Sequence, residues 1–291
     1  MCLCGALSCL CPSRPKFLSR KYVDLIYPLD GSYANYTAAR RFDVGDFGVI
    51  DKETGLFEKH GSIFDPELSI SDYDELTQLI SLYSEPKPDP PSTSTHLKSN
   101  GIKQMGVTGG INVPDGKAEW KFEFGSHYGA VLILVQPYST NLCNTYNLRP
   151  LLQFLEEKHI LDDQVIVTSV THCPAYAFTI SRGCWNSVTF SLIGAYPPFA
   201  ASAGIYIKNS KASGVHDIGS QPGVIYTPLL RLGTLKEGCL RTQYRMISTD
   251  GPVKAVSDTV DDMFEPYALP WGPLNEDGEE IKGRSHGEKS T

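Results

Sequence analysis

The stretch YAFTIS, residues 176–181, decides the fold class, because its aromatic and aliphatic side chains stand at every second position. The stretches VTFSL (188–192) and WKFEF (120–124) repeat this alternation. A period of two places successive side chains on opposite faces of a β-sheet. We therefore expect two β-hairpin regions between residues 101 and 195, with a short helix between them. Their apolar faces are formed by Trp120, Phe122, Phe124, Tyr176, Phe178, Ile180, Val188, Phe190 and Leu192.

Strands of this kind fit two settings. They can lie half-buried in a soluble domain, or they can line a pore with one face in lipid and the other in water. A membrane-spanning strand needs about 9–11 residues, and segments 119–135 and 175–193 are long enough. Gly125, Gly129 and Gly183 weaken these strands in a soluble form. The pattern leaves both settings open.

The remaining elements follow from turn and helix signals. The segment 51–55 lies between two short apolar runs and predicts a hairpin. Residues 71–83 predict a helix with an acidic first turn, and residues 148–158 predict a second helix with a leucine stripe. Residues 85–95 hold four prolines and predict an exposed loop.

Length and composition exclude several classes of protein. The chain has 291 residues, of which 41% are hydrophobic, so it can bury a core. No run of 18 apolar residues occurs, and we expect no transmembrane helix. No basic patch interleaves with aromatic residues, so we expect no nucleic-acid partner. No basic segment precedes the apolar residues 2–11, which argues against a signal peptide.

Charge is concentrated at the two ends of the chain. Of the net charge of −7, residues 246–291 carry −6, from ten acidic and four basic residues. The first 41 residues carry +4, from six basic and two acidic residues. These basic residues are Arg14, Lys16, Arg20, Lys21, Arg40 and Arg41. Either both ends are simply solvated, or an acidic end masks a basic end that faces a membrane.

Four of the eight cysteines crowd the N-terminus, at Cys2, Cys4, Cys9 and Cys11. A zinc site is one interpretation, but no histidine or acidic residue lies nearby. S-acylation beside the basic residues 14–21 is the interpretation we favour, because acyl chains and cations together anchor a protein stably. An unstructured end is the third interpretation.

His172 and Cys173 form the pair that most invites a catalytic interpretation. Neighbours on a strand point to opposite faces, so they cannot act as nucleophile and base for each other. The glycine-rich segment 106–110 lacks the lysine of a phosphate loop, and the segment 45–48 has no other kinase motif around it. We expect no enzymatic activity, no cofactor and no metal.

The order of elements supplies a family resemblance. A basic, apolar N-terminal segment precedes a hairpin, and a leucine-rich helix leads directly into QVIVTSV (164–170). This join resembles the gasdermin pore-forming domain, in which a helix runs into an apolar strand. The motifs VGDFGVID (44–51), CPAYA (173–177) and YTPL (226–229) look more specifically like fungal gasdermin-like cell-death proteins. The resemblance covers roughly residues 17–240.

The resemblance implies an α+β fold with a twisted, largely antiparallel sheet and flanking helices. It implies a pore-forming domain over residues 17–245. The cysteine-rich segment 1–16 precedes this domain, and the acidic segment 246–291 follows it as a flexible tail that either inhibits the domain or has no inhibitory role. This tail is much shorter than the C-terminal inhibitory domain of mammalian gasdermins. The N-terminal cysteines are not part of the family pattern.

The implied function is that of a cytoplasmic protein that moves to the plasma membrane on activation. There it would bind anionic lipids through the six basic residues above, assemble with copies of itself, insert the two hairpin regions and promote lytic cell death. A protease or a related partner protein would release the tail. The alternative is a soluble α+β enzyme or ligand-binding domain of another family.

Overall fold

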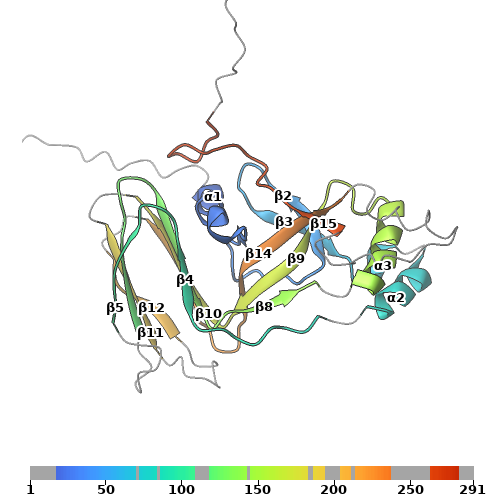
Figure 1. Cartoon of the computed structure of the whole chain (residues 1–291), viewed down its shortest axis with the longest axis horizontal. Helices are drawn as coiled ribbons and strands as arrows, with labels where there is room; N and C mark the ends of the chain where they lie inside the picture. The colour runs from blue at the N-terminus through green and yellow to red at the C-terminus, as the bar shows by residue number, and fades with distance from the viewer. Residues whose placement is uncertain are drawn as a thin grey trace, which may run out of the picture.

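The computed structural model describes residues 18–69, 72–83, 86–108, 118–142, 145–182, 186–193, 204–210, 214–236 and 263–281. Within them the chain is α+β, with mostly antiparallel sheets and few helices, as expected. Helix α1 (Leu18–Asp30) lies between two bodies of β-structure (Figure 1). Helices α2 (Tyr73–Ser81) and α3 (Thr145–Glu157) pack against each other at the far end. Both fall where the sequence predicts helices.

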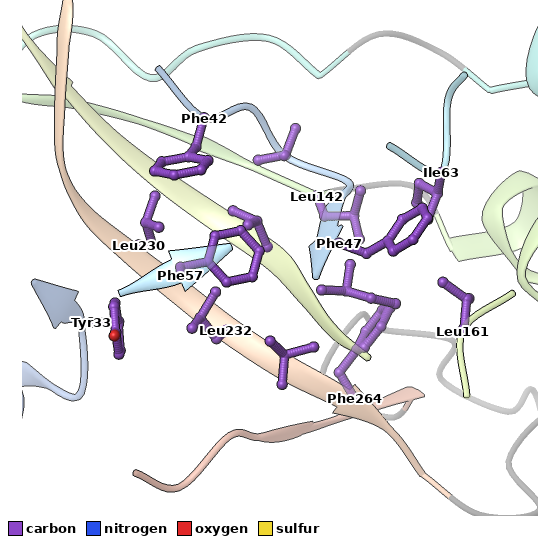
Figure 2. Close-up of a cluster of buried hydrophobic side chains, with 14 of the residues drawn as sticks. Tyr33, Phe42, Phe47, Phe57, Ile63, Leu142, Leu161, Leu230, Leu232 and Phe264 are labelled. Carbon is purple, nitrogen blue, oxygen red and sulfur yellow. The ribbon is translucent and has the colours of Figure 1, made fainter. Parts of the chain in front are cut away.

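One body is a seven-stranded antiparallel sheet in the order β1-β14-β9-β2-β3, with β15 added on β14 and β8 on β9. Its strands are β1 (Tyr33–Ala34), β2 (Asp46–Ile50), β3 (Phe57–Ser62), β8 (Tyr138–Asn141), β9 (Val165–Cys173), β14 (Tyr226–Leu235) and β15 (Phe264–Pro266). The predicted hairpin around residues 51–55 is the β2–β3 pair, and a short 3-10 helix (Pro66–Leu68) follows it. The core of this body includes Phe47, Phe57, Leu232 and Phe264 (Figure 2).

The other body is a sandwich of two four-stranded antiparallel sheets. The β10 sheet runs β13-β10-β7-β4, and the β11 sheet runs β12-β11-β6-β5. The first contains β4 (Thr95–Lys98), β7 (Gly129–Val135), β10 (Ala175–Ser181) and β13 (Val215–Gly219). The second contains β5 (Lys103–Thr108), β6 (Ala118–Glu123), β11 (Ser187–Ile193) and β12 (Gly204–Ser210). One hydrophobic cluster joins the facing sides of both sheets.

The sandwich corrects the predicted hairpins. Strand β6 pairs with β11, and β7 pairs with β10, so neither β6–β7 nor β10–β11 is a hairpin. Each of these consecutive pairs instead crosses from one sheet to the other, forming an arch. Two apolar sheet faces bury more surface when they cover each other than when a single sheet leaves one exposed. Within the first region only β5 and β6 form the expected kind of antiparallel neighbours.

Two prolines mark features of these elements. Helix α1 continues past Pro28 to Asp30, although a proline inside a helix removes one backbone hydrogen bond. Strand β9 passes into β10 at Pro174, where the chain leaves the seven-stranded sheet and enters the sandwich. Pro174 is therefore the junction between the two bodies.

Candidate functional site

Helix α1 contacts both bodies through neighbouring positions on its surface. The ring of Tyr22 stacks on Phe178 of β10, with 4.5 Å between ring centroids, and Tyr36 packs on the same phenylalanine at 5.3 Å. Val23 joins the core of the seven-stranded sheet instead. The basic residues of α1 thus occupy a helix that contacts both halves of the molecule.

Arg20 is buried, although the sequence predicts that it binds lipid. Its Nε and Nη2 atoms donate to the carbonyl oxygen of Gly278 at 3.2 and 2.5 Å, and its Nη1 atom donates to the carbonyl of Lys52 at 2.7 Å. The guanidinium also lies 5.7 Å from the ring centre of Trp271 and 3.6 Å from a carboxylate oxygen of Glu280. These contacts satisfy a charge that would otherwise be costly to bury.

Lys21 is covered from the same side. Its Nζ atom donates to the carbonyl oxygen of Leu274 at 3.3 Å and lies 3.6 Å from a carboxylate oxygen of Asp24. Burial raises the pKa of Asp24, while the neighbouring Lys21 ammonium opposes this shift. Both predicted lipid-binding cations of α1 therefore face the C-terminal part of the chain in this structure.

We call residues 263–281 the strap. Its first strand, β15, pairs with β14 in the register Leu235↔Phe264, and Met263 and Phe264 are buried in the core of the seven-stranded sheet. Trp271 and Leu274 are buried further along, and Figure 1 shows the strap passing over α1. This differs from the flexible tail that the acidic composition predicts, because the apolar side chains of the strap fill the core.

The strap, helix α1 and the β2–β3 turn meet at Gly55. This residue has a φ of +67°, and an added Cβ atom would lie 2.8 Å from the Cα atom of Arg20 and 3.1 Å from the ring of Trp271. Only glycine adopts this backbone conformation without strain and leaves room for both neighbours. The close approach fixes the arginine beneath the strap.

Glu276 connects the strap with the two arches of the sandwich. Its carboxylate contacts the β6–β7 connection through His127 Nδ1 at 3.0 Å and the backbone N–H of Tyr128 at 3.4 Å. It also lies 3.8 Å from Arg182, which begins the β10–β11 connection. The side chains of Glu276, His127 and Arg182 are partly exposed, so each of these contacts is weak. A single acidic side chain nevertheless touches the turning points of both arches.

The nine predicted membrane-inserting residues divide between two cores. Six of them face each other or their neighbours inside the sandwich: Trp120, Phe122, Phe124, Val188, Phe190 and Leu192. Tyr176, Phe178 and Ile180 point to the other side of the β10 sheet, where α1 covers them. All nine are buried, but the structure does not place them on one common surface.

Arg40 and Arg41, the other predicted lipid-binding residues that the structure describes, each contact a neighbouring side chain. Arg41 is exposed and pairs with Asp43 at 3.1 Å, and the guanidinium of Arg40 lies over the ring of Phe42. Arg14, Lys16, Cys2, Cys4, Cys9 and Cys11 lie outside the described residues. Their predicted roles remain predictions.

His172 and Cys173 point to opposite sides of β9, as their adjacency predicts. Cys173 is fully buried in the hydrophobic cluster that also contains Tyr22 of α1, and burial raises the pKa of its thiol well above the usual range. His172 packs against the ring of Tyr138 at 5.2 Å instead. A buried, protonated thiol is a poor nucleophile.

Within the described ranges, no helix is long and apolar enough to cross a membrane. The same residues contain no cluster of three histidine, cysteine or acidic side chains that could hold a metal ion.

No family model and no curated protein matches this sequence. One similar solved structure is the cryo-EM structure of the gasdermin A3 membrane pore. The match covers 75% of this chain and 89% of that chain, at 12% sequence identity and a TM-score of 0.28. At this TM-score the similarity does not establish that the two chains share a fold.

Sequence reasoning missed the residues that cover the basic helix. Gly278 and Leu274 act through backbone carbonyl oxygens, which no side-chain pattern reveals. Glu276 is one of ten acidic residues in its segment, and nothing in its local sequence distinguishes it. The apolar island around Trp271 was the available signal, because such residues in an acidic segment are typical of a docking contact.

Proposed function

We propose that this chain is a gasdermin-like, membrane-binding pore former that oligomerises in lipid bilayers and promotes lytic cell death. It acts from the cytoplasm on anionic lipids of the plasma membrane. A protease or a related partner protein releases the strap. Enzymatic activity plays no part in this function.

The observation that carries the proposal is the pair of arches, β6–β7 and β10–β11, with their apolar inner faces. The β7–β10 pairing already joins the two arches side by side. If each arch opens into a hairpin, the strand order becomes β6-β7-β10-β11. This conversion keeps the β7–β10 pairing and breaks the β6–β11 pairing.

The opening also determines which side chains meet lipid. In an arch the inner side chains of the two strands face each other. If each strand rotates by a quarter-turn about its own axis, in opposite senses, both sets of inner side chains come to lie on the same face of the resulting hairpin. Phe122 and Phe190 then share a face with Ile133 of β7, all from the sandwich core. Phe178 lies on the opposite face. The lipid-facing set therefore comprises the six sandwich residues of β6, its C-terminal extension and β11, without Tyr176, Phe178 and Ile180.

The strap supplies the resting state in this proposal. It covers Arg20 and Lys21 and touches both arch connections through Glu276. Its displacement exposes two cations of α1, each of which contributes about 1 kcal/mol of attraction near an anionic membrane surface. In this proposal Arg14, Lys16, Arg40 and Arg41 are further cations that bind anionic lipid.

S-acylation of Cys2, Cys4, Cys9 and Cys11 would hold the N-terminus at the same membrane. Intact-mass measurement of protein isolated from cells tests this part separately. Added acyl masses support it, whereas four free thiols or a stoichiometric zinc ion contradict it.

A disulfide across β6 and β11 tests the proposed conversion. Lys121 and Thr189 are direct cross-strand partners, with side chains on the outer face of the sandwich. Facing residues of antiparallel strands are close enough for a disulfide with little backbone movement. The oxidised double variant Lys121→Cys/Thr189→Cys should lose most dye leakage from liposomes that contain phosphatidylserine. A reductant should restore the leakage.

A matched control is Val49→Cys/Glu58→Cys, which locks β2 to β3 in the seven-stranded sheet. This pair takes no part in the conversion, so oxidation should leave leakage unchanged. Full leakage by the oxidised β6–β11 variant would contradict the proposed opening. No leakage from the native chain, and none after deletion of residues 246–291, at any lipid composition would favour the soluble alternative.

A further inference from the structure

A cavity of 520 Å³ lies beside the seven-stranded sheet, away from the strap. The β2–β3 hairpin, strands β8 and β9, and the proline-containing segment 86–88 form its walls. This volume falls within the usual range for small-molecule sites. Phe64, Tyr138 and Ile225 supply apolar surface, and the rest of the lining includes both charged and uncharged side chains.

His172 lines this cavity, and one of its ring nitrogens lies buried behind the cavity wall without a partner in the part of the chain that the structure describes. Its side chain is more than nine-tenths buried, and its Nδ1 atom has no hydrogen-bond partner among the described residues. Buried polar atoms are normally paired, and an orphaned one requires an explanation. Burial lowers the pKa of His172, so near neutral pH the ring is neutral and carries one donor and one acceptor nitrogen.

Among the charged groups of the cavity, Lys59 keeps unused donors, whereas Asp46 has no free acceptor oxygen. Both carboxylate oxygens of Asp46 are occupied, one by Lys59 Nζ at 2.7 Å and the other by the backbone N–H of Asp43 at 3.0 Å. An ammonium group has three N–H donors, and Asp46 accounts for one of those on Lys59. Arg41 uses its Nε and Nη2 atoms on a single oxygen of Asp43.

We propose that this cavity binds a small organic carboxylate, with the carboxylate toward Lys59 and His172 and an apolar body against Phe64, Tyr138 and Ile225. The ligand's negative charge uses the spare donors of Lys59. Because Nδ1 of His172 is closed to solvent, the Nε2–H of its neutral ring supplies the second hydrogen bond. The apolar body replaces water along the cavity wall. This site does not depend on pore formation, because the cavity involves neither the strap nor the sandwich core.

Benzoate is a suitable probe, because it combines a carboxylate with one aromatic ring, and benzyl alcohol is its uncharged counterpart. Ligand-observed NMR titration with the full-length chain measures both affinities. We expect benzoate to bind about tenfold more tightly than benzyl alcohol, which is the effect of one charge-assisted hydrogen bond. Equal affinities, or no benzoate binding, would overturn the proposal.

Two variants locate the binding. The paired change Lys59→Met/Asp46→Asn removes the ammonium without leaving a buried carboxylate unpaired, and it should weaken benzoate binding about tenfold. Ile225→Trp leaves the charges intact and fills the cavity from a partly exposed position, so it should abolish binding. The control Lys208→Met removes a cation that pairs with Glu119 on the sandwich, and it should change nothing. Melting curves identify any variant that does not fold, and benzoate affinity retained in folded Ile225→Trp would refute the site.

Discussion

The guanidinium of Arg20 donates two hydrogen bonds to the carbonyl oxygen of Gly278, a residue 258 positions further along the chain. The contact joins the first described helix to the last described segment. Arg20, which the sequence predicts to bind a membrane surface, therefore forms its contacts inside the protein in this structure. Its availability to lipid depends on whether the strap stays in place.

Arg20→Met tests the energetic weight of this contact. The change leaves the carbonyl oxygens of Gly278 and Lys52 without their buried donor, so we expect a loss of about 1.5–3 kcal/mol in the free energy of unfolding. Urea denaturation measures it. The control Arg41→Gln removes an exposed ion pair and should cost about 0–1 kcal/mol. Equal effects of the two changes would mean that the strap contact contributes little.

Glu276→Gln tests the contacts between the strap and the two arch connections separately from the stability of the hydrophobic core. We expect less than about 1 kcal/mol of lost stability, because the contacts to His127 and Arg182 lie at the surface. Backbone amides of the strap should nevertheless exchange hydrogen faster, and leakage from anionic liposomes should increase. Glu265→Gln, at another exposed carboxylate of the strap, should alter neither measurement. The same exchange rate in both variants would remove Glu276 from the mechanism.

Gly55→Ala probes the junction of turn, helix and strap. A left-handed backbone costs a non-glycine residue about 1–2 kcal/mol. Gly101 has a similar φ of +83° with no atom within 4 Å of an added Cβ, so Gly101→Ala isolates that backbone cost. The clash with Arg20 should add about 1–3 kcal/mol at Gly55. Both values come from chemical denaturation, and equal losses would show that the junction relaxes freely.

The stability of the protein should fall as the pH drops below about 6.5, the ordinary pKa of histidine. Burial lowers the pKa of His172 in the folded state, so the unfolded chain binds more protons in this range and acid favours unfolding. Nearby Asp43 and Arg41 act on this pKa in opposite directions. His172→Gln should therefore lose less stability than the native chain between pH 7.5 and 5.5. Parallel pH profiles would assign the acid sensitivity to other groups, such as His96, whose pKa burial also lowers.

Local sequence patterns determined the secondary structure of this protein well. The alternation in residues 176–181 specifies a strand with two distinct faces, because successive side chains of a strand must point in opposite directions. Turn residues 51–55 specify the β2–β3 hairpin, and leucine spacing specifies α3. Each of these signals involves only a few consecutive residues, so it can be read directly from the local sequence.

Only the tertiary structure decided which partners these elements take. Alternation identifies an apolar face but not the surface that covers it, so Phe190 and Phe178 look equivalent in sequence while they lie in different cores. The pairing of β6 with β11 joins segments separated by a helix and four strands. The burial of Arg20 depends on a backbone carbonyl oxygen of the strap. Every residue has such an oxygen, so the residue types of the strap do not reveal this contact. Such backbone contacts, and the pairing of sheet faces that are distant in sequence, form only when the whole chain packs. For that reason the candidate site is visible in the fold and not in the sequence motifs.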